Sequence, residues 1–218
     1  MRILFLNQFY APDVAATGQL LADVTEELAG RGHEVHVICS RRAYHGGDSS
    51  FPKEELVDGV YVHRLGATGF GGDRTLGQVL NYGSFFLLAS LKAVRLPRMD
   101  MCVALTTPPF VGLIALVLHA LRGTKLAIWT MDLYPEVAVA LGVLRDRSVP
   151  CSVLAWLSRR LYRQAGAIIS LGEVMAGRLV QAGAPPEKIA IVHNWVPREI
   201  VAAAPPEPAQ APVSAASL

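Results

Sequence analysis

Residues 167–193 read AIISLGEVMAGRLVQAGAPPEKIAIVH and carry the clearest indication of fold class. Two short runs rich in Ile, Ala167–Ser170 and Ile189–His193, enclose a segment from Glu173 to Gln181 whose apolar residues recur at helical spacing. Nearly continuous apolar runs are typical of strands that are buried on both faces of a sheet. The stretch therefore predicts a strand–helix–strand unit with two parallel strands.

The same alternation runs through the rest of the chain. Further strands are predicted at Ile3–Asn7, Glu34–Cys39, Val60–Arg64, Met101–Leu105 and Leu126–Thr130. Further helices are predicted at Gly18–Ala29, Leu76–Arg95, Phe110–Leu121 and Cys151–Gln164. About seven strands with intervening helices predict a doubly wound α/β fold, in which a mostly parallel, Rossmann-like sheet is covered by helices on both faces.

The predicted domain covers residues 1–197, and a length of 218 residues suits one large domain. From Ala202 to Leu218 the composition shifts to Ala, Pro and small polar residues without periodicity. Residues 198–218 are therefore predicted to be a disordered tail or linker.

The composition excludes several classes of protein. Twenty basic against 18 acidic residues give a net charge of +2, so no nucleic-acid partner is indicated. A hydrophobic content of 52% excludes disorder for the bulk of the chain. Three cysteines without CxxC spacing indicate neither disulfides nor a zinc site, and no cluster of His and carboxylates has metal-ligand spacing. We expect a reducing, cytoplasmic location and no metal.

A mean hydropathy of +0.35 raises the question of membrane contact. The longest apolar run, Phe110–Leu121, is shorter than the roughly 20 residues of a membrane-spanning helix. Residues 85–96 begin with four consecutive large apolar residues and have Lys92, Arg95 and Arg98 in or beside them. This segment is either an ordinary buried helix with solvated ends or an amphipathic helix that lies on anionic lipid at the inner face of the plasma membrane.

Ligands of doubly wound sheets bind outside the carboxyl ends of the strands, so the loop from Asn7 to Gln19 is a candidate site. It does not match GxGxxG. Thr17 and Gly18 either begin an ordinary capped helix or allow a phosphate or sugar to approach the helix N-terminus.

The sequence after the strand at 126–130 contains two carboxylates beside an aromatic residue. Asp132 is either an acid–base group or a residue that caps the following helix. Glu136 is placed where a carboxylate complements a helix dipole, which favours a structural role. Thr107 either presents its hydroxyl to a ligand or caps a helix, and Ser170 or Glu173 either faces a cleft or caps a helix. His193 is expected to be a hydrogen-bonded core residue rather than a catalyst.

Seven motifs stand in an order that resembles the amino-terminal domain of family-four GT-B glycosyltransferases. These motifs are Met1–Leu4, Asn7–Pro12, Thr17–Gly18, Gly32–Val35, Asp132–Glu136, Ile168–Ser170 and Lys188–Trp195. The resemblance covers Met1 to about Pro197 and is to the bacterial enzymes of colanic acid, capsule or O-antigen synthesis.

The resemblance implies a retaining hexosyltransferase with two Rossmann-like domains, no required metal and a nucleotide-sugar as co-substrate. Its first domain binds a lipid-linked saccharide acceptor and its second binds the donor. By position, it implies a catalytic Asp132, a donor-phosphate site at Thr17 and Gly18, and acceptor contacts at Phe9, Tyr10, Thr107, Tyr134 and Glu136. Many relatives have Trp at the position of Tyr134.

The resemblance also leads us to expect a donor domain after Asn194–Pro197, where this sequence continues into its Ala/Pro-rich stretch. Three explanations stay open: a fragment, a split enzyme with a separate donor-domain polypeptide, or a non-catalytic module for acceptor binding or membrane docking. A nucleotide-sugar epimerase of the same architecture is a further alternative that rests on fold analogy.

Overall fold

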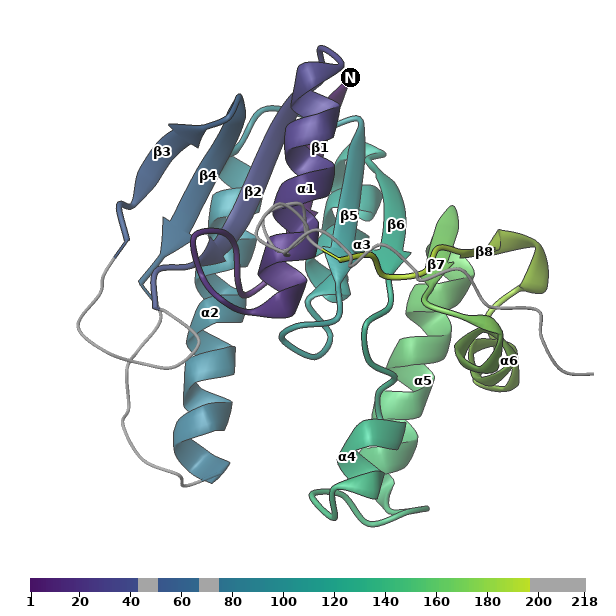
Figure 1. Cartoon of the computed structure of the whole chain (residues 1–218). Helices are drawn as coiled ribbons and strands as arrows, with labels where there is room; N and C mark the ends of the chain where they lie inside the picture. Colours follow the sequence, from purple (N-terminus) through teal and green to yellow (C-terminus); the bar gives the residue numbers. More distant parts are fainter. Residues whose placement is uncertain (43–50, 67–74, 197–218) are drawn as a thin grey trace, which may run out of the picture.

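The computed structural model describes residues 1–42, 51–66 and 75–196. Within these ranges it contains one eight-stranded sheet with helices on both faces (Figure 1). The strand order is β3-β4-β2-β1-β5-β6-β7-β8, and every described pair is parallel except β3 with β4. The strands are β1 (Arg2–Leu6), β2 (Glu34–Ser40), β3 (Glu54–Val57), β4 (Val60–Leu65), β5 (Met101–Leu105), β6 (Lys125–Trp129), β7 (Ala167–Ser170) and β8 (Ile189–Ile191). The predicted doubly wound α/β fold is confirmed.

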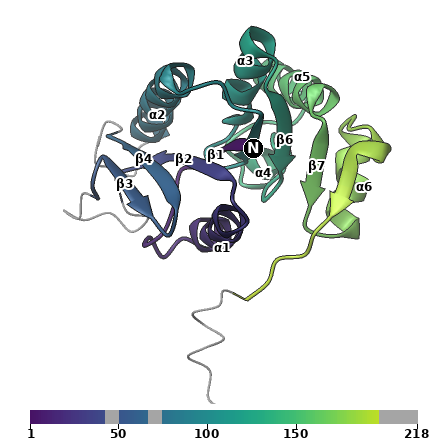
Figure 2. The ribbon, with the colours of Figure 1, turned by 90° about the horizontal axis from the view of Figure 1, so that it is seen from above.

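Helices cover the two faces unequally (Figure 2). The helices are α1 (Ala16–Gly30), α2 (Thr75–Arg95), α3 (Gly112–Arg122), α4 (Glu136–Ala140), α5 (Val149–Gln164) and α6 (Glu173–Gln181), with a 3₁₀ turn at Pro186–Lys188. Side chains of β1 alternate between the faces. Ile3 and Phe5 lie in the core cluster under α1, whereas Leu4 and Leu6 lie in the cluster formed with α2, α3, α5 and α6.

Strand β3 was not predicted. Its sequence is EELV, with two glutamates and an exposed Leu56. Because it is a solvent-facing edge strand, it lacks the apolar run of a buried strand. It joins β4 through Asp58 and Gly59, which both have positive φ (49° and 82°). A two-residue Asp-Gly turn of this kind is a hairpin signal, and reading it would have found the strand.

The chain after β8 returns across the sheet face that carries α1 (Figure 1). The Trp195 ring stacks on Trp129, with centroids 6.0 Å apart, and its Nε1 donates a 2.7 Å hydrogen bond to Oδ2 of Asp23 on α1. The last described residues are therefore tied to the first helix. The predicted tail at 198–218 lies outside the described residues.

Helix α2 has two different apolar sides. Phe85, Ala89 and Ala93 are buried against the sheet, whereas Leu87 and Leu91 are 61% and 44% exposed. One side of this helix is therefore left uncovered by the rest of the described chain. In the described ranges, no helix combines the length and apolarity needed to cross a membrane.

Candidate functional site

The loops that follow β1, β5 and β6 meet at the carboxyl edge of the sheet. The sheet changes winding direction between β1 and β5, the place where doubly wound folds form a ligand crevice. The backbone nitrogen of Gln8 donates to the carbonyl oxygen of Thr107 at 2.7 Å, which joins the first two loops. The hydroxyl of Thr106 joins the second loop to the third.

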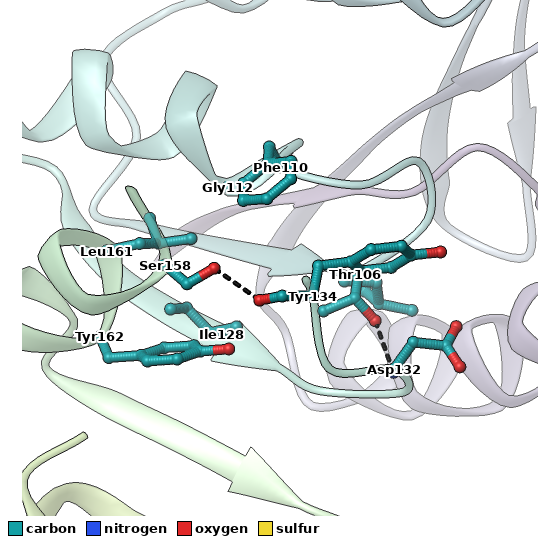
Figure 3. Close-up of a pocket in the computed structure, with 10 residues that line it drawn as sticks. Thr106, Phe110, Gly112, Ile128, Asp132, Tyr134, Ser158, Leu161 and Tyr162 are labelled. Atoms are coloured by element: carbon teal, nitrogen blue, oxygen red, sulfur yellow. Dashed lines mark hydrogen bonds between the residues drawn. The ribbon is translucent and has the colours of Figure 1, made fainter. Parts of the chain in front are cut away.

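The turn after β6 is held by a single hydroxyl (Figure 3). Oγ1 of Thr106 accepts hydrogen bonds from the backbone nitrogens of Met131 at 3.0 Å and Asp132 at 2.9 Å. Asp132 is half-buried and is one of the residues that line the small cavity drawn in Figure 3. Within the described residues, no hydrogen bond or ion pair engages the Asp132 carboxylate, so it is available to a ligand.

Tyr134 lies on the same turn, and residues of α5 and of the loop before α3 contact it. Oγ of Ser158 on α5 donates to its carbonyl oxygen at 2.7 Å, and the Phe110 ring lies 6.2 Å from the Tyr134 ring. Burial raises the pKa of Tyr134, and the nearby Asp132 charge adds to this effect. A small cavity of about 30 Å³ separates these groups from Tyr162 (Figure 3). The turn thus rests on α3 and α5 with little free space.

A larger cavity of about 520 Å³ opens on the other side of Asp132, between α4 and α6. Glu136, the exposed first residue of α4, lies on its wall together with Glu173 and Arg178 of α6. Of the predicted residues, Asp132 lines both cavities, Tyr134 lines only the small one and Glu136 only the large one. Phe9 and Thr107 lie half-buried on neighbouring loops of the same edge. Of the α6 wall, only Glu173 was expected, as a residue that either faces a cleft or caps a helix. The meeting of α6 with α4 was not predicted, because the two helices are far apart in sequence.

Gly18 approaches its own loop very closely. A Cβ atom there would lie 3.1 Å from the backbone nitrogen of Tyr10 and 3.2 Å from the carbonyl carbon of Phe9. The close approach of the protein's own backbone therefore explains why position 18 requires glycine, without any ligand. Helix α1 begins at Ala16, slightly before the predicted start, and Thr17 Oγ1 accepts a long hydrogen bond of 3.5 Å from Nδ2 of Asn7. The donor-phosphate role of Thr17 and Gly18 stays a prediction.

Tyr10 is a core residue, which corrects its predicted place on the acceptor side. It is 2% exposed, and its hydroxyl forms a 2.8 Å hydrogen bond with Oγ1 of Thr25 on α1. Burial raises its pKa to about 12. The loop folds back onto α1 and turns this side chain inward, which its position in the sequence does not reveal.

Histidines contribute no metal site in the described part of the chain. No group of three or more His, Cys, Asp and Glu side chains there is arranged to hold a metal ion. Nδ1 of His193 lies 2.8 Å from the carbonyl oxygen of Leu171, so this residue is hydrogen-bonded as predicted. Its predicted place in the core is wrong, because β8 ends at Ile191 and His193 is exposed beyond it.

Comparison with solved structures shows the fold. Anabaena HepE in complex with UDP and glucose matches with a TM-score of 0.52 and 16% identity over 90% of this chain and 45% of that one. Sucrose-phosphate synthase from Thermosynechococcus elongatus matches with a TM-score of 0.62 and 10% identity, over 90% of this chain and 48% of that one. UDP-GlcNAc 2-epimerase from Methanocaldococcus jannaschii matches with a TM-score of 0.52 and 14% identity, over 89% of this chain and 46% of that one. The chain thus spans about half the length of each, and the fold alone does not separate transferases from epimerases.

Comparison with sequence families separates these two classes of enzyme better than the fold does. The family model described as "Glycosyl transferase 4-like domain" matches residues 16–195. No curated protein sequence matches the chain significantly. The family match spans α1, the turn that carries Asp132, and the returning segment at Trp195.

Proposed function

The chain belongs to the family of glycosyl transferase 4-like domains, and from this membership we propose that it is the acceptor-binding half of a retaining glycosyltransferase. The reaction moves a hexosyl group from a nucleotide-sugar to a lipid-linked saccharide in bacterial cell-surface polysaccharide synthesis, as in the colanic acid, capsule or O-antigen enzymes. The family match and the GT-B fold support a glycosyltransferase, and the span of about half of each fold relative supports a half-domain.

The observation that carries the proposal is the Asp132 turn. Thr106 fixes the backbone at the carboxyl edge of the sheet, and Asp132 lines a cavity large enough for part of an acceptor. In the proposed step, the acceptor oxygen bonds to the anomeric carbon on the face that the diphosphate leaves, so that the configuration is retained, and Asp132 accepts the proton of the acceptor hydroxyl. The bond between that carbon and the diphosphate oxygen breaks, and the diphosphate leaves with the electron pair.

The donor enters this proposal as a co-substrate and not as a resident cofactor. The HepE structures are complexes with UDP, glucose or UDP-glucose. For this chain we propose that Thr17 and Gly18 approach the donor diphosphate, and that a second domain or polypeptide supplies most of its binding. Stabilising the leaving diphosphate requires preorganised donors, so the chain alone should transfer sugar weakly.

A lipid-linked acceptor places the protein at a membrane surface. We propose peripheral contact at the cytoplasmic face through the exposed side of α2. Leu87, Leu91 and Val94 are exposed there, and Arg95 and Arg98 follow at the end of the helix. Such an apolar stripe beside basic groups suits anionic lipid.

The test is transfer from a panel of radiolabelled nucleotide-sugars to extracted membrane lipid. The full chain is assayed alone and with a separately expressed donor domain of the same family. We expect labelled lipid only, or far faster, with the second domain present. Acceptor binding without transfer in every combination would instead support a non-catalytic subunit that binds acceptor or docks on the membrane.

A further inference from the structure

The cavity between α4 and α6, here called the α4–α6 groove, has a composition that restricts its ligand. Its volume of about 520 Å³ falls within the roughly 300–1,000 Å³ of small-molecule sites. Asp132 belongs to its lining, so a group bound in the groove lies beside the proposed reaction centre. The groove is therefore placed to select the acceptor.

The walls of the α4–α6 groove are aliphatic. Val137 and Ala140 come from α4, Leu171 follows β7, and Val174 and Met175 come from the first turn of α6. Val174 is 77% exposed. Covering such side chains with aliphatic carbon is favourable by about 25 cal/mol per Å² of apolar surface. No aromatic side chain is among the described lining residues.

The charged residues of the α4–α6 groove are mostly acidic. Asp132, Glu136 and Glu173 supply three carboxylates against the single guanidinium of Arg178. Within the described part of the chain, no salt bridge neutralises these carboxylates. A surplus of negative charge repels phosphate, whereas carboxylate oxygens accept hydrogen bonds from hydroxyl groups.

We propose that the α4–α6 groove binds an uncharged, hydroxyl-bearing part of the acceptor that carries aliphatic carbon, and that it keeps phosphate outside. This inference rests on the proposed function, because it identifies the bound group as part of the acceptor. The hydroxyl groups face Asp132, Glu136 and Glu173, and the aliphatic carbon covers Val137 and Val174. In a lipid-linked saccharide, the sugar end enters the groove and the phosphate groups lie beyond its rim.

The experiment measures binding of three probes to the full chain by titration calorimetry, below their micelle concentrations. The probes are octyl glucoside, glucose and dodecyl phosphate. We expect octyl glucoside to bind at least about tenfold more tightly than either of the others, a difference that corresponds to about 1.4 kcal/mol. Glucose lacks the aliphatic carbon, and dodecyl phosphate lacks hydroxyl groups and carries the excluded charge.

Two variants locate the binding. Ala140→Trp places a large side chain at an exposed position of the groove and should reduce octyl glucoside binding at least about tenfold. Ala120→Trp makes the same change at an exposed position of α3 and should leave binding unchanged. The double variant Glu136→Gln/Glu173→Gln should reduce the discrimination against dodecyl phosphate, whereas Glu187→Gln in the 3₁₀ turn should not.

Equal or tighter binding of dodecyl phosphate overturns the proposal, as does full binding of octyl glucoside to Ala140→Trp, or no binding of octyl glucoside to the unmodified chain. Binding is measured without any donor. Selective binding accompanied by no transfer in the assay above would therefore refute the proposed enzyme activity and leave the selectivity of the groove standing.

Discussion

The side-chain oxygen of Thr106 accepts a hydrogen bond from the backbone nitrogen of Asp132 at 2.9 Å, and the same oxygen accepts a second from Met131 at 3.0 Å. One hydroxyl on β5's loop thus fixes the turn after β6. Thr106→Val keeps the shape of the side chain but leaves two half-buried amides without this acceptor. We expect unfolding in urea to show a loss of about 1–3 kcal/mol, together with slower transfer.

Thr107→Val is the matched control for Thr106. No side-chain hydrogen bond is recorded for the Thr107 hydroxyl in the described ranges, so this variant should keep its stability within about 0.5 kcal/mol. If Thr107 contacts the acceptor, as predicted, KM for the acceptor rises. Equal destabilisation by both variants would contradict the specific role of Thr106.

Gly18→Ala should destabilise the protein by about 1–3 kcal/mol, because the new methyl group meets the backbone at Tyr10 and Phe9 and these atoms cannot yield as a flexible side chain does. Gly30→Ala, at the end of the same helix, has nothing within 4 Å of its Cβ position and should be neutral or stabilising. Thermal unfolding of both variants gives the comparison. A normal melting temperature for Gly18→Ala, with a raised KM for the nucleotide-sugar, would instead assign Gly18 to donor binding alone.

Trp195→Phe removes the hydrogen bond to the Asp23 carboxylate while keeping an aromatic ring against Trp129. We expect a loss of about 1–2 kcal/mol in the free energy of unfolding. Trp156→Phe, on an exposed part of α5, is the control and should have no effect. Limited proteolysis should also cut the returning segment faster in Trp195→Phe, and unchanged protection would show that this segment is held by other contacts.

His63 makes stability depend on pH. Its neighbours are His36, whose Nδ1 lies 3.1 Å from its Nε2, the Glu54 carboxylate at 3.7 Å, and Lys92, which pairs with Glu54. The pKa of His63 is lowered from 6.5 to about 4, chiefly by burial and then by the charges of Lys92 and His36, which together outweigh the opposite effect of the Glu54 carboxylate. The folded protein thus binds fewer protons than the unfolded chain between about pH 4 and 6.5, so stability falls as pH falls through this window.

The measurement is urea unfolding at several pH values between about 7.5 and about 4.5, a range that includes the reference pKa of histidine. In His63→Gln, the loss in the free energy of unfolding over this pH range should be smaller by on the order of 1 kcal/mol, a figure that stays this small because solvent screens the charges around the site. An identical pH dependence in His63→Gln and the unmodified chain would assign the effect to other groups.

Much of the fold follows from local sequence patterns. Buried parallel strands such as β7 have continuous apolar runs, and their connecting helices have helical spacing, so these elements were found with ends correct to within a few residues. Strand β3 was missed, because it is a polar edge strand. Of helix α4 only the start near Glu136 was expected, because its five residues are too few for a helical period to emerge.

The candidate site was predictable only in outline. Asp132 could be singled out because a carboxylate follows a buried strand, and such positions share one edge of the sheet. The bridging role of Thr106 and the burial of Tyr10 depend on how loops pack against other elements, which no local pattern encodes. The same is true of the α4–α6 groove, whose two walls are separated in the chain by α5 and β7.

The proposed role of Asp132 is in sugar transfer, at the edge of the sheet where the acceptor binds. Its most direct test is the initial rate of transfer by Asp132→Asn in the presence of a saturating donor domain, with Asp146→Asn, at an exposed position before α5, as the control. We expect a rate at least roughly a hundredfold lower for Asp132→Asn, with octyl glucoside binding changed only a few-fold and the control unaffected. A rate for Asp132→Asn equal to that of the unmodified chain would contradict the proposed role.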